Sequence, residues 1–452
     1  MPLKPVYGHD ALRARLASAL LGGRLPQVLL FTGPVGSGRQ RLALWLGQAA
    51  LCDDPSPTGP CGRCAECRLC QELVHPDLHW FIPVARGKAT DPAKLVDEVK
   101  IAIAEVVAER REQGLWEPPD GTTGHWLAAV RLLQRVASVT PFRAGRKVLI
   151  LGDAERLVVQ EANLEAANAL LKVLEEPPQN TCIVLLTERY EAILETIRSR
   201  CQLIEFRPLA VADVVQALRD ELAAAGTDVS AADAGVAYYA AGGRVAVARA
   251  LLEGRPMKAG KASGAQTEDN EKPTWAFART RELVDTILAD LEHRDDDQLI
   301  ADVALFADKY VDLLGEVASH ISQAPFEAED IEGMALDRRH SSRLKAFREA
   351  WEGRSAVSRT AAGAEVILNL FALAWRDLLC AASGVEDLAV DRPGLARRVH
   401  VLKNAGAAGP IRALEAVRKA RDRVRHNVSV RNALLAMLME IPEVTRWRRR
   451  SA

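Results

Sequence analysis

The stretch Gly33-Pro34-Val35-Gly36-Ser37-Gly38-Arg39-Gln40 has the outline of a phosphate-binding loop. Such a loop follows the pattern G-x-x-x-x-G-K-[ST]: backbone amides cradle phosphates, the Lys reaches the outer phosphates, and the hydroxyl holds Mg²⁺. Here Arg39 stands at the Lys position and Gln40 at the hydroxyl position. A planar guanidinium differs from a compact ammonium, and glutamine replaces a small hydroxyl poorly beside an octahedral cation. The glycines predict the shape of the loop, whereas Arg39 and Gln40 predict the loss of its chemistry.

The neighbours of this loop support the interpretation. Val28–Thr32 is a short apolar run of the kind that forms buried strands, and a helical pattern starts with Arg41–Leu46. A strand, a glycine turn and a helix form the setting that a phosphate-binding loop requires. The alternative is a chance glycine-rich turn.

Three further apolar runs predict buried strands: 147–151, 182–187 and 201–206. An amphipathic helix is expected over Gln160–Glu176, and Pro177-Pro178 ends it. Because strands alternate with helices, we expect a parallel α/β sheet with flanking helices.

The residues after the 147–151 strand bear on catalysis. In an active NTPase this strand end carries an Asp for the Mg²⁺ shell and then a Glu that acts on the attacking water. Alignment of the strand ends places Gly152 at the metal position and Asp153 at the base position. A shift of one residue would restore an Asp at the metal position, and an ordinary acidic helix start is the other alternative.

Composition limits the possible functions. The chain has 452 residues, which predicts about two to four domains, and its formal net charge is −1. It therefore lacks the global cationic character of many nucleic-acid binders. We see no secretory signal pattern and no apolar run long enough to span a membrane, so we expect a cytoplasmic protein with reduced thiols.

Five of the eight cysteines lie between Cys52 and Cys70. Four closely spaced thiolates can form a closed tetrahedral Zn²⁺ site, which leaves no open position for catalysis. The spacing alone leaves open which four of the five bind the metal, and His75 is a further possible ligand. A disulfide or unrelated thiols are the alternatives. The five clustered residues are Cys52, Cys61, Cys64, Cys67 and Cys70.

Three more motifs complete the pattern: His75-Pro76-Asp77, the run Asn168-Ala169-Leu170-Leu171-Lys172-Val173-Leu174-Glu175-Glu176-Pro177-Pro178, and Ser199-Arg200-Cys201. With the loop and the cysteine cluster, they resemble the bacterial clamp-loader AAA+ subunits of DNA polymerase III, over about residues 7–208. The resemblance implies an α/β AAA+ P-loop domain with a zinc-binding insertion, then a small helical lid and an all-α collar. It also favours Cys52, Cys61, Cys64 and Cys67 as the zinc ligands over Cys70.

The family contains active gamma/tau ATPases, which have a complete P-loop and an Asp-Glu pair, and a non-catalytic member that keeps the Ser-Arg-Cys motif. This chain resembles the non-catalytic member. The resemblance implies a subunit that is not an enzyme by itself, in which ATP binding is not expected. Its implied partners are the gamma/tau and delta subunits and, through the complex, the sliding clamp and primed DNA.

By the same resemblance, Arg200 is an arginine finger that points into the ATP site of an adjacent gamma/tau subunit, where such a residue can contribute ~10³–10⁵ in rate. Ser199 and Cys201 would hold the turn that aims it. A structural salt bridge of Arg200 is the alternative.

The expected domains are residues 1–208 with the zinc module at 52–70, a lid at 209–255, a linker at 256–274 and a helical collar at 275–445. Residues 85–125 form a stretch longer than the family usually has, with a helical pattern over Lys94–Arg111. AAA+ lids usually carry a nucleotide-sensing arginine near the position of Gly242-Gly243-Arg244. The best alignment places Val245 at the sensor position and Arg244 one residue before it, and a solvated arginine is the alternative. A possible basic face, more simply a solvated one, comprises Arg412, Arg418, Arg421 and Arg425.

Two other functions stay open on the sequence. One is an active gamma/tau-like ATPase with an unusual P-loop, which nucleotide affinity would reveal. The other is a zinc-containing DNA-binding protein with a vestigial NTPase fold, which the neutral balance of charge argues against.

Overall fold

The computed structural model describes residues 5–113, 123–143, 145–158, 165–223, 229–252, 275–290, 310–311, 313–314, 356–402, 408–426 and 428–445. The chain divides into two compact units, Met1–Asp213 and Val214–Ala452. Each unit is described by itself.

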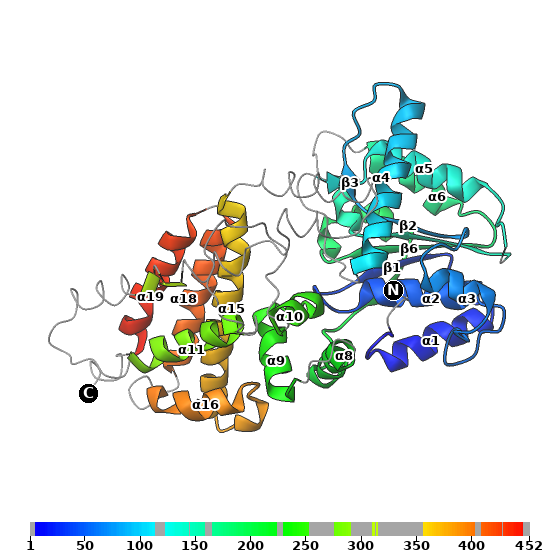
Figure 1. The fold of residues 1–452 in the computed structure, drawn as a ribbon. Helices are drawn as coiled ribbons and strands as arrows, with labels where there is room; N and C mark the ends of the chain where they lie inside the picture. The colour runs from blue at the N-terminus through cyan, green and yellow to red at the C-terminus, as the bar shows by residue number, and fades with distance from the viewer. Residues whose placement is uncertain are drawn as a thin grey trace, which may run out of the picture. The chain divides into compact units, whose positions relative to one another are not determined.

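The first unit is built on a five-stranded parallel sheet with the strand order β2-β5-β6-β1-β7 (Figure 1). Two predicted strands are confirmed with their bounds, β1 (Val28–Thr32) and β5 (Lys147–Leu151). The other two are confirmed with small shifts, as β6 (Thr181–Thr187) and β7 (Gln202–Glu205). The edge strand β2 (Leu78–Phe81) was not expected from the sequence.

Both faces of the sheet are buried, which explains the continuous apolar strands. Along β1, Leu30 packs into one hydrophobic cluster, whereas its neighbours Leu29 and Phe31 pack into the other. Side chains alternate between the faces because successive residues of a strand point in opposite directions. The sheet therefore has two cores, one on each side.

Helices cover the two faces (Figure 1). On one side lie α1 (Asp10–Leu21) and α2 (Arg39–Leu51), with the short α3 (Ala65–Gln71) beside α2. The opposite side has α4 (Pro92–Gln113), α5 (Leu127–Ser138) and α6 (Glu165–Glu175). The helix expected at 160–176 is α6, and residues 160–164 lie outside the described part of the chain.

The unusually long stretch at 85–125 contains α4 and closes on a short antiparallel pair. In this pair β3 (Val84–Ala85) is joined to β4 (Thr123–Gly124), so the two ends of the stretch lie together. The helical pattern expected over 94–111 is confirmed as part of α4. Residues 114–122 are not described.

From residue 214 onward the described residues form helices and no strand, which confirms a helical C-terminal part. The boundary between the units falls within α8 (Val211–Ala223). The predicted linker at 256–274 lies outside the described residues, and the domain boundaries stay predictions. Of the helices described, none is both long and apolar enough to cross a bilayer.

The later helices are α9 (Ala231–Ala240), α10 (Val245–Leu252), α11 (Trp275–Asp290), α15 (Ala356–Ala382), α16 (Arg392–Arg398), α18 (Ala408–Arg425) and α19 (Val430–Thr445).

A buried ionic cluster joins α11 to α16 in the second unit. Asp391, whose side chain is 1% exposed, pairs with Arg281 and with Arg398, the latter at 3.0 Å. Arg398 also pairs with Asp285 of α11. Burial alone would raise the pKa of Asp391, but Arg398 and Arg281 more than offset this effect and hold the pKa below its usual range.

Candidate functional site

The predicted loop keeps the backbone of a phosphate-binding loop. It follows β1 directly, and Gly38 caps the N-terminus of α2 in a left-handed conformation (φ 82°) that favours glycine. A Cβ on Gly33 would lie 2.6 Å from the carbonyl oxygen of Phe206, the residue after β7 (Gln202–Glu205). Only glycine therefore fits where the loop backbone passes Phe206. His9 Nε2 donates to the carbonyl oxygen of Ser37 at 2.7 Å. The loop shape inferred from the sequence is therefore present.

Arg39 is turned inward and held by its own chain. It is only 8% exposed, and its guanidinium donates to the carbonyl oxygen of Thr187 and pairs with Glu188 at 3.3 Å. Burial lowers the pKa of Arg39, although Glu188, Glu155 and Asp153 act in the opposite direction. An arginine stays charged in proteins, so this buried cation needs its partners. Gln40 follows, half-buried, in the first turn of α2.

The end of β5 carries Gly152 and then Asp153, in the order expected from the sequence. The Gly152 amide donates to the carbonyl oxygen of Phe81 at 2.9 Å, and the Gly152 carbonyl accepts from His125 Nε2 at 2.6 Å. Burial lowers the pKa of His125 to about 4, which keeps its ring neutral near pH 7. One backbone contact and one side-chain contact thus fix the strand end, and Asp153 is the first acidic residue after it.

These groups meet because parallel strands place their carboxyl ends along one edge of a sheet. The loop after β1 and the segments after β5 and β6 all lie there. The negative charges of Glu188, Glu155 and Asp153 lie close enough to Arg39 to oppose the effect of burial on its pKa. The predicted nucleotide-site residues therefore come together, while Arg200 and the cysteines belong to other parts of the unit.

Arg200 lies in a tight turn between α7 (Glu195–Arg198) and β7. The Ser199 hydroxyl donates to the Thr196 carbonyl at 3.1 Å, and the Cys201 thiol donates to the Ile197 carbonyl at 3.1 Å. Burial raises the pKa of Cys201 to about 12, so the thiol stays protonated. The two flanking residues thereby hold the turn, and the Arg200 side chain is about one-third exposed at 34%.

The turn lies at the amino ends of the parallel strands, and the phosphate-binding loop lies at their carboxyl ends. Gln202 pairs in parallel register with Leu29 and Glu205 with Thr32. Arg200 precedes the start of this paired segment, and the loop follows its end. At ~3.3 Å per residue, at least about 10 Å of strand separates them. Arg200 and the loop of its own chain therefore lie at opposite ends of the paired strands β1 and β7.

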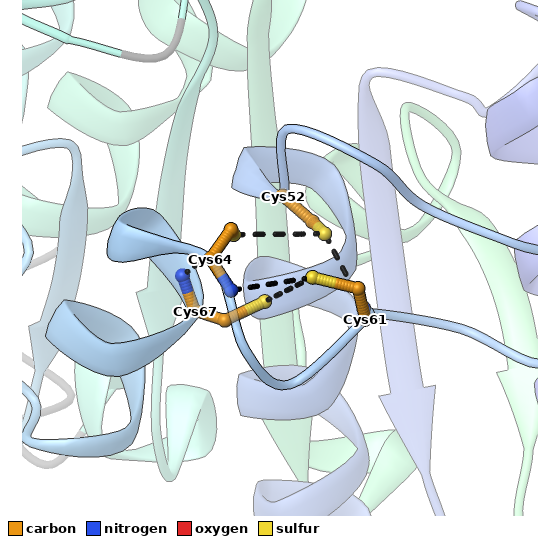
Figure 2. Close-up of side chains that lie close together, drawn as sticks. All are labelled: Cys52, Cys61, Cys64 and Cys67. Carbon is orange, nitrogen blue, oxygen red and sulfur yellow. Dashed lines mark hydrogen bonds between the residues drawn. The ribbon is translucent and has the colours of Figure 1, made fainter.

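Four of the clustered cysteines converge (Figure 2). The sulfur atoms of Cys52, Cys61, Cys64 and Cys67 all lie within 4.8 Å of one another. The Cys52–Cys64 and Cys61–Cys67 sulfur distances are 3.9 and 4.0 Å. Tetrahedral Zn²⁺ with Zn–S bonds of ~2.3 Å needs sulfur separations of about 3.8 Å, whereas a disulfide needs ~2.0 Å. The four thiols fit a closed zinc site.

Backbone amides support this cluster. The amide of Cys61 donates to Cys52 Sγ, that of Cys64 to Cys61 Sγ, and that of Cys67 to Cys64 Sγ, at 3.3, 3.4 and 3.3 Å. Backbone hydrogen bonds lower the pKa of Cys61 to about 6, which favours the thiolate form that binds metals. Cys70 lies elsewhere, fully buried in the hydrophobic core beside the sheet, and burial raises its pKa to about 12.

His75 braces the cysteine module instead of joining it. Its Nδ1 accepts from the Asp77 amide at 3.0 Å, so Nε2 carries the proton and donates to Glu66 of α3 at 2.7 Å. Arg143 binds the same Glu66 carboxylate through two of its nitrogens, and this contact lowers the pKa of Glu66. Asp77 in turn accepts the amides of Phe142 and Arg143 at 2.7 and 2.8 Å. The His-Pro-Asp motif therefore ties α3 to β2 and to the loop before β5.

Sequence reasoning did not identify the partners of the two key arginines. Glu188 follows the predicted strand at 182–187 directly, which was an available signal. Glu175, which pairs with Arg200, lies inside a motif that was noticed for its family resemblance alone. Neither pairing is visible in the spacing, because each joins residues far apart in the chain.

Two arginines of the possible basic face have described side-chain partners. Arg418 pairs with Asp422 at 3.1 Å, and Arg421 donates to Asn369 at 2.7 Å. Arg244 is exposed at the start of α10, next to Val245. The exposed Arg244 and the exposed Arg418–Asp422 pair agree with the solvated alternative, whereas Arg421 is half-buried and makes a structural contact. The side chain of Arg425 and the tail 446–452 lie outside the described residues.

A parallel sheet with a glycine loop at the carboxyl ends of its strands, followed by a helical part, agrees with the fold expected for an AAA+ P-loop domain. Residues 8–210 match the family model described as "DNA polymerase III, delta subunit". Through these residues, which make up less than half of the chain, it is similar to the clamp-loader subunits of DNA polymerase III.

The relatives include both kinds of subunit. DNA polymerase III subunit delta' of Bacillus subtilis is 31% identical over 186 residues, which cover 41% of this chain and 44% of that protein. Subunit tau of Bacillus subtilis is 24% identical over 210 residues, 46% of this chain and 30% of that protein. The matches thus span less than half of each relative. A gamma-subunit-related protein of Thermotoga maritima aligns at 15% identity over 95% of this chain and 99% of its own, with a TM-score of 0.35.

Proposed function

We propose that this chain is a delta-prime-like, non-catalytic subunit of a bacterial DNA polymerase III clamp loader. In this role it helps a neighbouring ATPase load the sliding clamp on primed DNA. Its partners are the gamma/tau and delta subunits, and the clamp and DNA are reached through the complex, in the cytoplasm. The higher identity to a delta' subunit than to a tau subunit supports this choice.

The observation that carries the proposal is the engagement of Arg39. A P-loop lysine must be available to the outer phosphates, but the Arg39 guanidinium is bound to Thr187 and Glu188 of its own chain. A triphosphate would also meet the negative charges of Glu188, Glu155 and Asp153. Gln40 offers no hydroxyl for Mg²⁺. We therefore infer that the loop has a structural role and does not bind ATP appreciably.

Arg200 is proposed as an arginine finger for the ATP site of an adjacent subunit. Its place at the edge opposite its own loop supports action in trans, because its own phosphates would be out of reach. Transition-state charge at the γ-phosphate is what such a residue stabilises. Ser199 and Cys201 serve as the supports of its turn.

A structural Zn²⁺ held by Cys52, Cys61, Cys64 and Cys67 is the second part of the proposal. Four thiolate ligands would close the metal shell, so the ion would contribute stability to the module and no catalysis. The residues that would hold it come from the end of α2, the following loop and the start of α3, which the ion would join together.

Nucleotide turnover by the isolated chain tests the proposal. We expect no appreciable steady-state ATPase activity and no saturable binding of a fluorescent ATP analogue at micromolar concentrations. Arg39→Lys combined with Gln40→Thr should recover some binding without full hydrolysis, because Gly152 still lacks the metal-binding carboxylate. The matched control is Arg41→Lys, the same change of residue type two positions further along the same helix. Turnover by the unaltered chain at the rate of a gamma/tau subunit would establish the active-ATPase alternative instead.

A further inference from the structure

The guanidinium of Arg200 is held by a carboxylate from another element. Arg200 NH2 donates to Glu175 Oε1 at 2.6 Å, and NH1 donates to the Thr196 carbonyl at 2.7 Å. Glu175 is the last residue of α6, 25 positions earlier in the chain. The pair therefore joins the C-terminus of α6 to the turn after α7.

The position of Glu175 is unusual for an acidic residue. The C-terminal end of a helix carries a partial negative charge, which favours cations and disfavours carboxylates. Lys172 in the same last turn follows this preference, whereas Glu175 opposes it. A nearby cation offsets this unfavourable placement, and Arg200 provides it.

The pair remains accessible to a partner molecule. The side chains of Arg200 and Glu175 are 34% and 49% exposed. A guanidinium has five N–H donors, and the described acceptors are Glu175, Thr196 and the Ser199 hydroxyl, so two donors remain for a phosphate. Exposed pairs of this kind are weak, so the contact orients Arg200 without locking it.

The neighbouring Arg198 shows a different arrangement. Its guanidinium lies 4.7 Å from the centre of the Tyr190 ring and pairs with Glu191 at 2.7 Å. The Arg198 guanidinium is therefore held by residues of its own chain, the Tyr190 ring and the Glu191 carboxylate. Arg200 also pairs with a carboxylate, but no aromatic contact is described for its guanidinium.

Given the in-trans role proposed for Arg200, we propose that Glu175 is its positioning residue. The carboxylate sets the orientation of the guanidinium before an ATP-bearing subunit docks, so less side-chain freedom is lost when the arginine meets the phosphates. Glu175 touches neither nucleotide nor metal and acts only through Arg200.

A double-mutant cycle in the reassembled complex, with primed DNA and clamp present, tests this role. We expect Arg200→Ala to lower the steady-state ATPase rate by about threefold or more, since other interfaces keep their own arginines. Glu175→Ala should lower kcat by about twofold with KM for ATP and complex yield unchanged, and the double variant should equal Arg200→Ala alone. Glu175→Gln, which keeps an acceptor oxygen, should recover part of the loss. Arg198→Ala and Glu191→Ala are the matched controls, and both should leave kcat unchanged.

The outcomes separate the two proposals. No effect of Arg200→Ala would remove the in-trans role itself. A loss in Arg200→Ala with an unchanged or raised rate in Glu175→Ala would overturn the positioning role and leave the in-trans role in place. A Glu175→Ala effect of the same size in the Arg200→Ala background would also overturn it, because Glu175 would then act independently of Arg200.

Discussion

Arg39 and Arg200 carry the same functional group in two different environments. Arg39 is 8% exposed and bound to a carbonyl and a carboxylate at the carboxyl edge of the sheet. Arg200 lies at the other edge with its side chain 34% exposed. A buried charge must keep its partners, whereas an exposed pair exchanges at little cost in free energy. Residue identity alone therefore does not decide which arginine can reach a ligand.

At this scale we predict that Glu188→Gln destabilises the protein. Arg39 would remain buried without its charged partner, and the free energy of unfolding should fall by about 1–3 kcal/mol. Urea unfolding of the full chain, followed by tryptophan fluorescence, measures this change. The matched control is Glu191→Gln, on a carboxylate that is 84% exposed in its pair with Arg198, which should cost less than about 1 kcal/mol. Equal effects of the two substitutions would show that the Arg39 contact is unimportant for stability.

At the scale of elements, the cysteine module depends on two separate supports. Its thiols converge from the end of α2, the following loop and the start of α3. The second support is Glu66 of α3, whose carboxylate binds both His75 and Arg143. A helix as short as α3 has little stability alone, so both supports are needed to hold it.

We predict that Cys64→Ser lowers zinc content and thermal stability together, because one of four ligands is removed. Elemental analysis should find about one Zn²⁺ per unaltered chain and much less in the variant, and calorimetry should show a lower Tm. Cys70→Ala is the control, since Cys70 lies in the apolar core and alanine adds no polar group there. Protein purified without chelators that contains no zinc would contradict the metal assignment, and zinc loss in Cys70→Ala would contradict the ligand choice.

At the scale of the whole molecule, each unit has its own core. The first is organised by the sheet, whose two faces are buried under helices. The second is helical throughout its described residues, and its buried cluster of Asp391, Arg281, Arg398 and Asp285 joins α11 to α16. Such a cluster costs much free energy when one partner is removed, because the others stay buried without compensation.

We therefore predict that Asp391→Asn destabilises the second unit by about 3–5 kcal/mol and leaves the first unit unchanged. Hydrogen exchange of the full chain should show faster exchange in α11, α15 and α16, with β1, β5 and β6 unaffected. Asp387→Asn is the matched control, because the side chain of Asp387 is 99% exposed in its pair with Arg392. Loss of protection in both units would mean that they unfold as one body.

The sequence by itself determined the parallel sheet and the P-loop. The apolar runs at 28–32 and 147–151 match β1 and β5, and the glycine spacing predicted a loop whose conformation requires glycine at Gly38. These features are local, since burial on both faces demands unbroken apolar strands and a left-handed backbone demands glycine. The short edge strand at 78–81 was missed because four residues carry too little pattern.

Only the tertiary structure decided which side chains meet. The pairing of Arg39 with Glu188 joins positions 149 residues apart, and Arg200 reaches Glu175 across 25. Convergence of four thiols, with Cys70 turned into the core, likewise depends on how the loop after α2 folds back on α3. Spacing along a chain identifies groups that can interact, but strand register and helix packing set the distances, and electrostatic and metal interactions depend on distance.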